Sequence, residues 1–344
     1  MTGNVDTLRK AGIRDVARLA GVSPTTVSHA LGGKRPVSKL TRDRVLEAAA
    51  RLGYRPHPGA RSLKAAGTGV VMLCAVNVTS PTVSPANLEY YFKLMRGVTE
   101  EIYSHDLALV VVPESKSGVY WDRFLLDGAI VSDPVAGDEN IRFLRTRGIP
   151  YVTVGRNPEA PDEGYWVDND AAAAACLVLD RFASQGACNI ALITEMASDY
   201  WTQTSIAAYL AWCERHDQRP HVEIVPEDSE EALRESASRL LGARPRPDAV
   251  YGLYELPAVA VLRRAVELGI DVPGEIMAVA PGDFGVGAAM VPAMTTLDYN
   301  AELLGCEAAR MLIQLIRKEV PCEPHKLVPF SVIERGSTRH SPND

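Results

Sequence analysis

The sequence predicts a small all-α segment at the N-terminus, followed by a larger α/β body with parallel sheets. In residues 13–31 apolar side chains recur at spacings of three and four, which is typical of short helices packed on a core. Beyond residue 69 short apolar runs alternate with amphipathic stretches, as in repeated βαβ units. A short stretch with two glycines, residues 65–69, separates the two parts.

The N-terminal segment is predicted to contain two short helices in close succession. We expect the first over residues 13–20, because Gly21 interrupts its apolar stripe. The hydroxyl of Ser23 can cap a second helix that runs to Leu31, and Pro24 suits its first position, where no N–H is needed. The short connection forces a steep crossing, which leaves the second helix free to enter a major groove. Its exposed face would carry short side chains that can contact base edges: Thr25, Thr26, Ser28 and His29.

Basic residues are concentrated in the first 64 residues, where thirteen Lys and Arg stand against four Asp and Glu. This segment therefore carries +9, and the remaining 280 residues carry −16, because the whole chain carries −7. A charge run alone is usually a solvated face, and the helices alone could form a structural bundle. The helix pattern and the segregated charge together favour double-stranded DNA as a partner.

The body is predicted to alternate strands and helices along its length. Candidate parallel strands cover residues 70–76, 107–112, 128–131, 151–154, 189–194, 249–253 and 276–280. Candidate helices cover residues 88–104, 139–147, 171–185, 205–215, 230–241, 256–268 and 301–318. Only fifteen residues separate the second and third strands, so any helix between them must be short.

Length, cysteines and apolar runs narrow the class of protein. A chain of 344 residues allows two or three domains. The six cysteines form no CxxC pair and have no nearby His at metal-ligand spacing, which indicates reduced thiols and no metal site. No run reaches the roughly 18 to 20 apolar residues of a membrane span, and the N-terminus does not look like a signal peptide. We therefore expect a cytoplasmic protein with no cofactor and no membrane partner.

Catalytic motifs are missing, which argues against an enzyme. The sequence has no GxSxG elbow, no GxxxxGK[ST] loop, no HExxH and no GxGxxG after a strand. Asp283-Phe284-Gly285 copies a kinase tripeptide, but the other kinase motifs are missing, so we interpret it as a chance match. No catalytic residue is predicted.

Residues 13–64 contain a specific series of short motifs: Asp15-Val16-Ala17, Ala20-Gly21-Val22-Ser23, Thr25-Thr26-Val27-Ser28-His29, Val37-Ser38, Thr41-Arg42, Gly53-Tyr54 and Ala60-Arg61-Ser62-Leu63-Lys64. In these motifs the segment resembles the DNA-binding headpiece of LacI/GalR-family transcription regulators, especially the purine-repressor branch. The resemblance implies a headpiece over residues 1–56 and a hinge over residues 57–67 that folds on DNA, with Leu63 entering the minor groove. It implies these DNA contacts: Ser23, Pro24, Thr25, Thr26, Ser28, His29, Arg35, Tyr54, Ala60, Arg61, Leu63 and Lys64.

The body resembles the effector-binding part of the same family, which is similar to periplasmic sugar-binding proteins. The landmarks include Arg96-Gly97, Val167-Asp168-Asn169-Asp170, Pro247-Asp248-Ala249 and Thr295-Thr296-Leu297. The resemblance implies two lobes with a ligand cleft between them, over residues 68–344. The N-lobe would cover about 68–166 and 299–321, and the C-lobe about 167–297 and 325–338. The chain would cross near Val167, near Leu297 to Asp298 and near residues 321–324.

The cleft departs from the family at its polar positions. By that alignment Ser205 replaces a family arginine, Tyr254-Glu255 replaces an Asn-Asp pair, and Gly282-Asp283 replaces an acidic pair. The charged clamp is therefore expected to be mostly lost, and aromatic faces favour flat or apolar partners. We predict an aromatic or weakly polar effector, the alternative being a degenerate cleft without ligand. The predicted effector-binding residues are Tyr90, Tyr91, Tyr200, Trp201, Ser205, Tyr254, Glu255, Asp283 and Phe284.

Three functions compete at this stage. The favoured one is a DNA-binding transcription regulator, most often a repressor in this family, that binds a palindromic operator as a homodimer and works at the bacterial nucleoid. A solute-binding protein is disfavoured by the headpiece and by the lack of an export signal. An α/β enzyme is disfavoured by the missing catalytic motifs.

Overall fold

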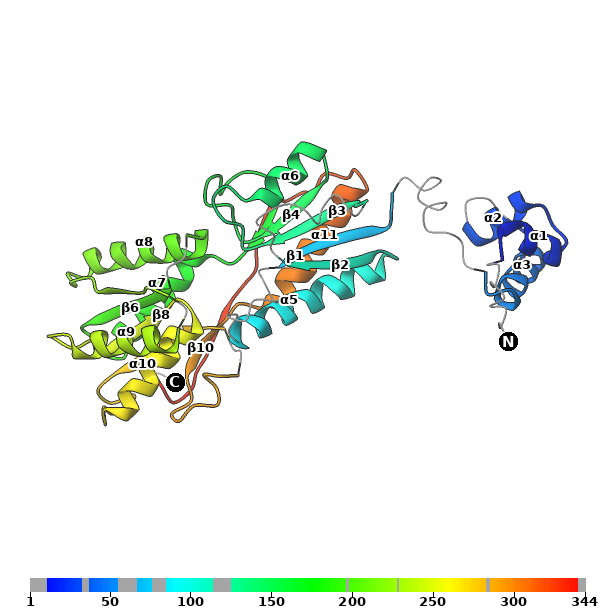
Figure 1. The fold of residues 1–344 in the computed structure, drawn as a ribbon. Coiled ribbons are helices and arrows are strands. Elements are labelled where there is room, and N and C mark those ends of the chain that lie inside the picture. Colours follow the sequence, from blue (N-terminus) through cyan, green and yellow to red (C-terminus); the bar gives the residue numbers. More distant parts are fainter. Residues whose placement is uncertain are drawn as a thin grey trace, which may run out of the picture. The chain divides into compact units, whose positions relative to one another are not determined.

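The computed structural model describes residues 11–32, 37–54, 67–75, 85–113, 125–195, 198–227, 229–282 and 285–339. These residues belong to two compact units, divided between Thr68 and Gly69. The first is an all-α headpiece and the second is a two-lobed α/β body with mostly parallel sheets, so the predicted fold class is confirmed. Figure 1 shows the elements of both units.

The described part of the headpiece has three helices: α1 (Ile13–Ala20), α2 (Pro24–Gly32) and α3 (Lys39–Arg51). Helix α1 has the predicted bounds, because Gly21 takes a left-handed backbone, with φ of 64°, and ends it. One face of each helix packs into a common core of small side chains, which allows close approach: Val16, Ala17, Ala20, Val27, Ala30, Val45, Ala48 and Ala49. This core holds α2 in place.

The N-lobe of the body is built on a six-stranded sheet in the order β11-β5-β4-β3-β1-β2. Its pairings are parallel. The strands are β1 (Val70–Ala75), β2 (Ala108–Pro113), β3 (Gly128–Ser132), β4 (Tyr151–Val154), β5 (Trp166–Asp168) and β11 (His325–Leu327). Helices α5 (Pro85–Ser104) and α11 (Ala301–Ile316) cover one face of the sheet, and α6 (Glu139–Arg147) covers the other.

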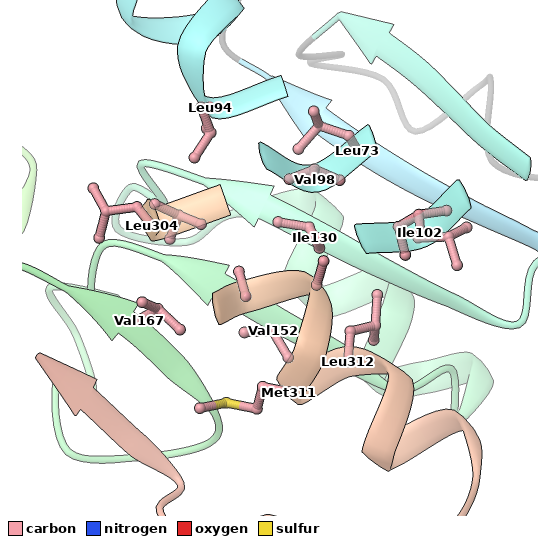
Figure 2. Packing of buried hydrophobic residues seen from close by; sticks show 14 of the residues in the cluster. Leu73, Leu94, Val98, Ile102, Ile130, Val152, Val167, Leu304, Met311 and Leu312 are labelled. Atoms are coloured by element: carbon pink, nitrogen blue, oxygen red, sulfur yellow. The ribbon is translucent and has the colours of Figure 1, made fainter. Parts of the chain in front are cut away.

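Alternation along β1 divides its side chains between the two faces of the sheet. Val71 and Leu73 pack with α5 and α11, whereas Met72 and Cys74 pack with α6. Figure 2 shows the first of these clusters, in which the two helices meet the strands through Leu73, Leu94, Val98, Ile102, Ile130, Val152, Val167, Leu304, Met311 and Leu312. A sheet buried on both faces explains why these strands appear in the sequence as continuous apolar runs.

Helices α5 and α11 touch backbone to backbone at two glycines. A Cβ atom on Gly97 would lie 2.0 Å from the carbonyl oxygen of Glu302, and one on Gly305 would lie 2.2 Å from the carbonyl oxygen of Leu94. No side chain can be accommodated there unless the helices separate. This contact brings α11, which follows strand β10 of the C-lobe in the sequence, against the first helix of the N-lobe.

The C-lobe repeats the architecture, with the sheet order β12-β10-β9-β8-β6-β7. Its strands are β6 (Ile190–Glu195), β7 (Val222–Val225), β8 (Ala249–Gly252), β9 (Met277–Pro281), β10 (Thr295–Asp298) and β12 (Ser331–Ile333), of which β12 pairs antiparallel with β10. Helices α7 (Ala171–Ser184) and α8 (Tyr200–Arg215) cover one face. Helices α9 (Glu230–Gly242) and α10 (Glu255–Glu267) cover the other.

The described chain passes between the lobes three times, after β5, after β10 and after β11. The third passage follows Leu327, so its predicted position near residues 321–324 is wrong. The reason is that β11 pairs in parallel with β5 and extends the N-lobe sheet, which also moves the start of the last C-lobe segment beyond residue 325. The C-lobe begins after β5, which ends at Asp168, whereas the predicted boundary was about residue 167.

One buried side chain joins the three passages. Asn169, in the first, is 4% exposed. Its amide nitrogen donates to the carbonyl oxygen of Tyr299 in the second passage, at 3.1 Å, and to that of Val328 in the third, at 2.9 Å. The Asn169 amide therefore contacts both of the other connecting segments, and a backbone hydrogen bond from Val328 N–H to the carbonyl oxygen of Asp168, at 2.8 Å, also joins the first segment to the third.

Candidate functional site

Helix α2 begins with a side-chain cap. The hydroxyl oxygen of Ser23 accepts the backbone N–H of Thr26 at 3.0 Å and lies 2.9 Å from the Thr26 hydroxyl. The predicted cap is thus present, and it fixes the first turn of the helix. The Thr26 hydroxyl keeps one further hydrogen-bonding position, since a hydroxyl can both donate and accept.

The N-terminal turn of α2 faces solvent. Ser23, Pro24 and Thr25 are exposed, and Thr26, Ser28 and His29 are half-buried. Tyr54 packs against the headpiece core from the end of the described segment. Arg35, Ala60, Arg61, Leu63 and Lys64 lie outside the described residues. The helix therefore presents a row of hydrogen-bonding groups of the size and type that a major groove accepts.

A cavity of about 320 Å³ lies between the two lobes of the body. Many of its lining residues stand at or just after the carboxyl ends of parallel strands, where open α/β folds place their ligands. These strand-end residues are Asp133, Pro134, Gly155, Arg156 and Asp168 in the N-lobe, and Glu195, Leu253 and Pro281 in the C-lobe. Both lobes contribute, so a ligand here would contact both.

The N-lobe side of the cavity combines aromatic and charged groups. Tyr91 donates its hydroxyl to Asp133 at 2.9 Å, and the ring of Tyr90 meets that of Tyr91 edge to face. Arg156 lies between two rings, with its guanidinium carbon 4.1 Å from the centre of Trp166 and 4.9 Å from that of Tyr200. It also donates to the Tyr200 hydroxyl at 3.1 Å, a contact between the lobes.

The C-lobe side is organised by the first turn of α8. Asp199 caps this helix by accepting the backbone N–H of Thr202 at 2.8 Å, and it also accepts the Tyr254 hydroxyl at 2.9 Å. Burial, and next the charge of Asp199, raise the pKa of Tyr254 well above its ordinary value, so its hydroxyl stays protonated as a donor. The rings of Trp201 and Tyr299 meet edge to face, with centres 4.8 Å apart.

The structure brings most of the predicted effector residues together. Six of them line the cavity: Tyr90, Tyr91, Tyr200, Trp201, Tyr254 and Glu255. Ser205 is different, because its side chain is fully buried in α8 and is not among the residues that line the cavity. The helix begins five residues earlier than predicted, so its first turn, and not Ser205, faces the ligand space. Asp283 and Phe284 lie outside the described residues.

The expected loss of charge from the cleft is wrong. Polar groups that the alignment did not consider supply new charges, namely Asp133, Arg156, Asp168, Glu195 and Asp199. The sequence signal was available, because Asp133, Arg156 and Glu195 each follow a predicted strand within two residues. In the part of the chain that the structure describes, no helix is long and apolar enough to cross a membrane, and no cluster of three or more metal ligands occurs.

Known protein families match parts of both units of the chain. A family model described as bacterial regulatory proteins, lacI family, matches residues 12–57, and one described as a periplasmic binding protein-like domain matches residues 179–338. The regulator CelR of Thermobifida fusca is 28% identical over 93% of this chain and 96% of its own length. The regulator MalR of Staphylococcus xylosus is 24% identical over 95% of this chain and 97% of its own length. The chain contains a lacI-family DNA-binding domain and a periplasmic-binding-protein-like domain.

A solved LacI-family structure has the same overall fold. The lac repressor dimer bound to operator and the anti-inducer ONPF matches this chain with a TM-score of 0.81 and 20% identity, over 96% of this chain and 99% of the repressor chain. The predicted resemblance is confirmed by the two matched domains. Together with the named relatives, these domains identify the protein as a DNA-binding regulator rather than an enzyme.

Asp168 is expected to make the stability of the α/β body depend on pH. Burial raises its pKa to about 7; the backbone N–H of Asn169 and the charge of Arg156 oppose the shift, and Asp133 adds to it. The folded state therefore holds more protons than the unfolded state between about pH 4 and pH 7, so this group lowers stability as the pH rises through that range. A rise of this pKa from 3.8 to about 7 corresponds to at most about 4 kcal/mol of folding stability.

Asp168→Asn should therefore raise the melting temperature of the body relative to the wild type, and by more at pH 8 than at pH 5. Thermal unfolding of the variant and the wild type at pH 5 and at pH 8 measures the difference in melting temperature. The exposed Asp162 gives a matched control, since Asp162→Asn should shift the melting temperature equally at both. A pH-independent effect of Asp168→Asn would contradict the assignment.

Proposed function

We propose that this protein is a transcriptional repressor that binds an inverted-repeat operator as a homodimer and changes its affinity for DNA when a small molecule enters the interlobe cavity. One observation carries the proposal. The chain has a basic headpiece in which the capped helix α2 exposes a polar N-terminal turn. It also has a body with a cavity that both lobes line. Such a chain can couple ligand binding to DNA binding.

Two solved structures of similar proteins support the proposed DNA binding as a dimer and the proposed binding of a small molecule. The lac repressor structure contains a dimer on its operator with an anti-inducer, and the structure of a regulator named CelR contains cellobiose. A two-fold dimer places its two DNA-contacting helices about 34 to 36 Å apart, one helical turn of DNA or a multiple of it. The operator of this protein should therefore be an inverted repeat, bound in the cytoplasm at the nucleoid.

The DNA contacts are proposed from α2 and its flanks. Thr25, Thr26, Ser28 and His29 contact bases or phosphates, and Ser23 and Pro24 lie at the phosphate backbone at the start of the helix. Arg35 and Tyr54 support the helix from either side. The hinge residues Ala60, Arg61, Leu63 and Lys64 enter the minor groove, with Leu63 as the apolar wedge.

The effector contacts are proposed from the aromatic lining of the cavity. Tyr90, Tyr91 and Trp201 offer ring faces and edges that favour a flat or apolar body. Tyr200, Tyr254 and Glu255 orient its polar groups, and Asp283 and Phe284 complete the site. The cavity volume of about 320 Å³ suits a small ligand.

In vitro selection from a random DNA library tests the function. We expect the purified protein to enrich an inverted repeat, and the enriched site to compete at least about a thousandfold better than random DNA at physiological salt. Analytical ultracentrifugation of the complex should give two protein chains per site. Enrichment of no sequence, or binding that disappears equally for all sequences as salt rises, would defeat the proposal.

A further inference from the structure

One side chain of the N-lobe contacts the C-lobe directly at the cavity. Arg156 lies just after β4, and its guanidinium donates to the hydroxyl oxygen of Tyr200, in the first turn of α8, at 3.1 Å. The guanidinium carbon lies 4.1 Å from the ring centre of Trp166 in the N-lobe and 4.9 Å from that of Tyr200 in the C-lobe. One cationic group therefore contacts a ring of each lobe and adds a hydrogen bond between the lobes.

The N-lobe end of this contact is tied to the N-lobe sheet. The backbone N–H of Gly155 donates to the carbonyl oxygen of Val167 at 2.9 Å, and the carbonyl oxygen of Gly155 accepts the Thr153 hydroxyl at 2.7 Å. The Nε atom of Arg156 lies 3.4 Å from a carboxyl oxygen of Asp168. Both the backbone before Arg156 and the base of its guanidinium are therefore anchored in the N-lobe.

The other end of the contact is anchored in the C-lobe. Tyr200 is the first residue of α8 and follows Asp199, which caps the helix by accepting the backbone N–H of Thr202 at 2.8 Å. The next residue, Trp201, packs edge to face against Tyr299. Because each end is anchored in its own lobe, a separation of the lobes at this point breaks the contact.

The contact is largely shielded from water. The side chain of Arg156 is 15% exposed, that of Asp168 is 13% exposed, and Trp166 is buried. Cation–π contacts and hydrogen bonds are stronger in such partly desolvated positions than at an open surface. The geometry also needs arginine, because a planar guanidinium can stack on rings and donate in its own plane, whereas a lysine ammonium is a compact point charge.

We propose that Arg156 and Tyr200 form a latch that holds the two lobes together without an effector. All the groups of this latch belong to the chain, so it needs no ligand to form. Both residues line the cavity, which places the latch where an effector would meet it. The link between the latch and DNA binding rests on the proposed function, whereas the latch itself does not.

Distances between the lobes of the full-length protein test the latch. Two exposed cysteines stand one on each lobe, Cys188 before β6 and Cys322 before β11, and both accept thiol-reactive spin labels. The half-buried Cys176 and Cys306 are replaced by alanine in every sample. Double electron–electron resonance then gives the distribution of distances between the labels, with excess unlabelled protein added to suppress signals between chains. The measurements are made at pH 8, above the pKa of about 7 of Asp168.

Three variants make the test specific. Tyr200→Phe keeps the ring and removes only the acceptor, whereas Arg156→Gln removes the guanidinium. Each should lower the ratio of latched to separated lobes about tenfold or more, seen as the growth of a second distance. Tyr151→Phe is the matched control, because the Tyr151 hydroxyl accepts the Nε–H of Arg145 at 2.7 Å within the N-lobe. This control should leave the distribution unchanged.

The latch is overturned if Arg156→Gln and Tyr200→Phe both leave the distance distribution unchanged, or if Tyr151→Phe changes it equally. It is also overturned if Tyr200→Phe adds its full effect to that of Arg156→Gln, because two groups that act through one contact are not additive. Mobility shifts with the selected operator are measured on the same variants. A changed distance with unchanged operator affinity would support the latch and defeat the proposed coupling to DNA, and failure of the wild type to bind any operator would defeat the proposed function.

Discussion

Thr25→Ala and Thr26→Ala are each expected to weaken binding to the selected operator by about 1 to 3 kcal/mol, while binding to random DNA stays the same. The two side chains lie on the exposed first turn of α2, which the Ser23 hydroxyl caps. A methyl group cannot replace a hydroxyl that donates to or accepts from a base edge. Non-specific affinity depends instead on the basic residues, which the substitutions leave in place.

Mobility shifts on selected and random duplexes at one salt concentration measure this difference. The matched control is Thr146→Ala on α6, which removes a threonine from the surface of the body and should change neither affinity. Circular dichroism of each variant establishes that the headpiece remains helical. Equal losses on selected and random DNA would refute the assignment of these side chains to base contacts.

Gly97→Ala is expected to destabilise the body by about 3 kcal/mol or more. Its new Cβ would lie 2.0 Å from the carbonyl oxygen of Glu302, and that oxygen belongs to the backbone of α11 and cannot rotate away. The two helices must separate, which loosens the cluster that they form over the N-lobe sheet in Figure 2. Close packing makes such a shift costly across the whole contact.

Urea unfolding followed by tryptophan fluorescence measures this loss in the body alone, because all four tryptophans follow residue 120. Gly242→Ala at the end of α9 is the control, since its Cβ would meet nothing within 4 Å. That variant should be unchanged or slightly more stable, because alanine restricts the unfolded chain. A midpoint for Gly97→Ala equal to that of the wild type would contradict the backbone contact.

Helices and strands with a strong hydrophobic periodicity or a long apolar run could be predicted from the sequence. Helix α6 has the predicted bounds, because Asp138 caps its start and Gly148 ends it, both of which are local signals. Strands β5, β11 and β12 have three residues each and were not predicted, because a pattern of that length carries no periodic signal. Strand β11 in turn explains the wrong position of the third passage between the lobes.

The aromatic part of the cavity could be predicted from the family alignment. Its charged residues could be located after predicted strands, but their arrangement around the cavity could not be predicted. Tyr91 lies on α5 and Tyr254 immediately precedes α10, and both line the cavity as the alignment predicted. Asp133 and Asp199 come from the loops that follow strands, and their distance from Tyr91 and Tyr254 depends on how the two lobes fold. Which loops meet across a cleft is a property of tertiary structure, and no single stretch of sequence contains it.

The amide group of Asn169 limits the ways in which the two lobes can move. Its nitrogen binds carbonyl oxygens in both of the other connecting segments, so a movement that slides one segment along another breaks at least one of these bonds. A rotation that carries all three segments together breaks neither. Any movement between the lobes that keeps both hydrogen bonds must therefore carry the three connecting segments together. Because Asn169 also lines the cavity, a ligand bound there would lie beside the connecting segments, and its contacts would favour the relative position of the lobes that they fit best.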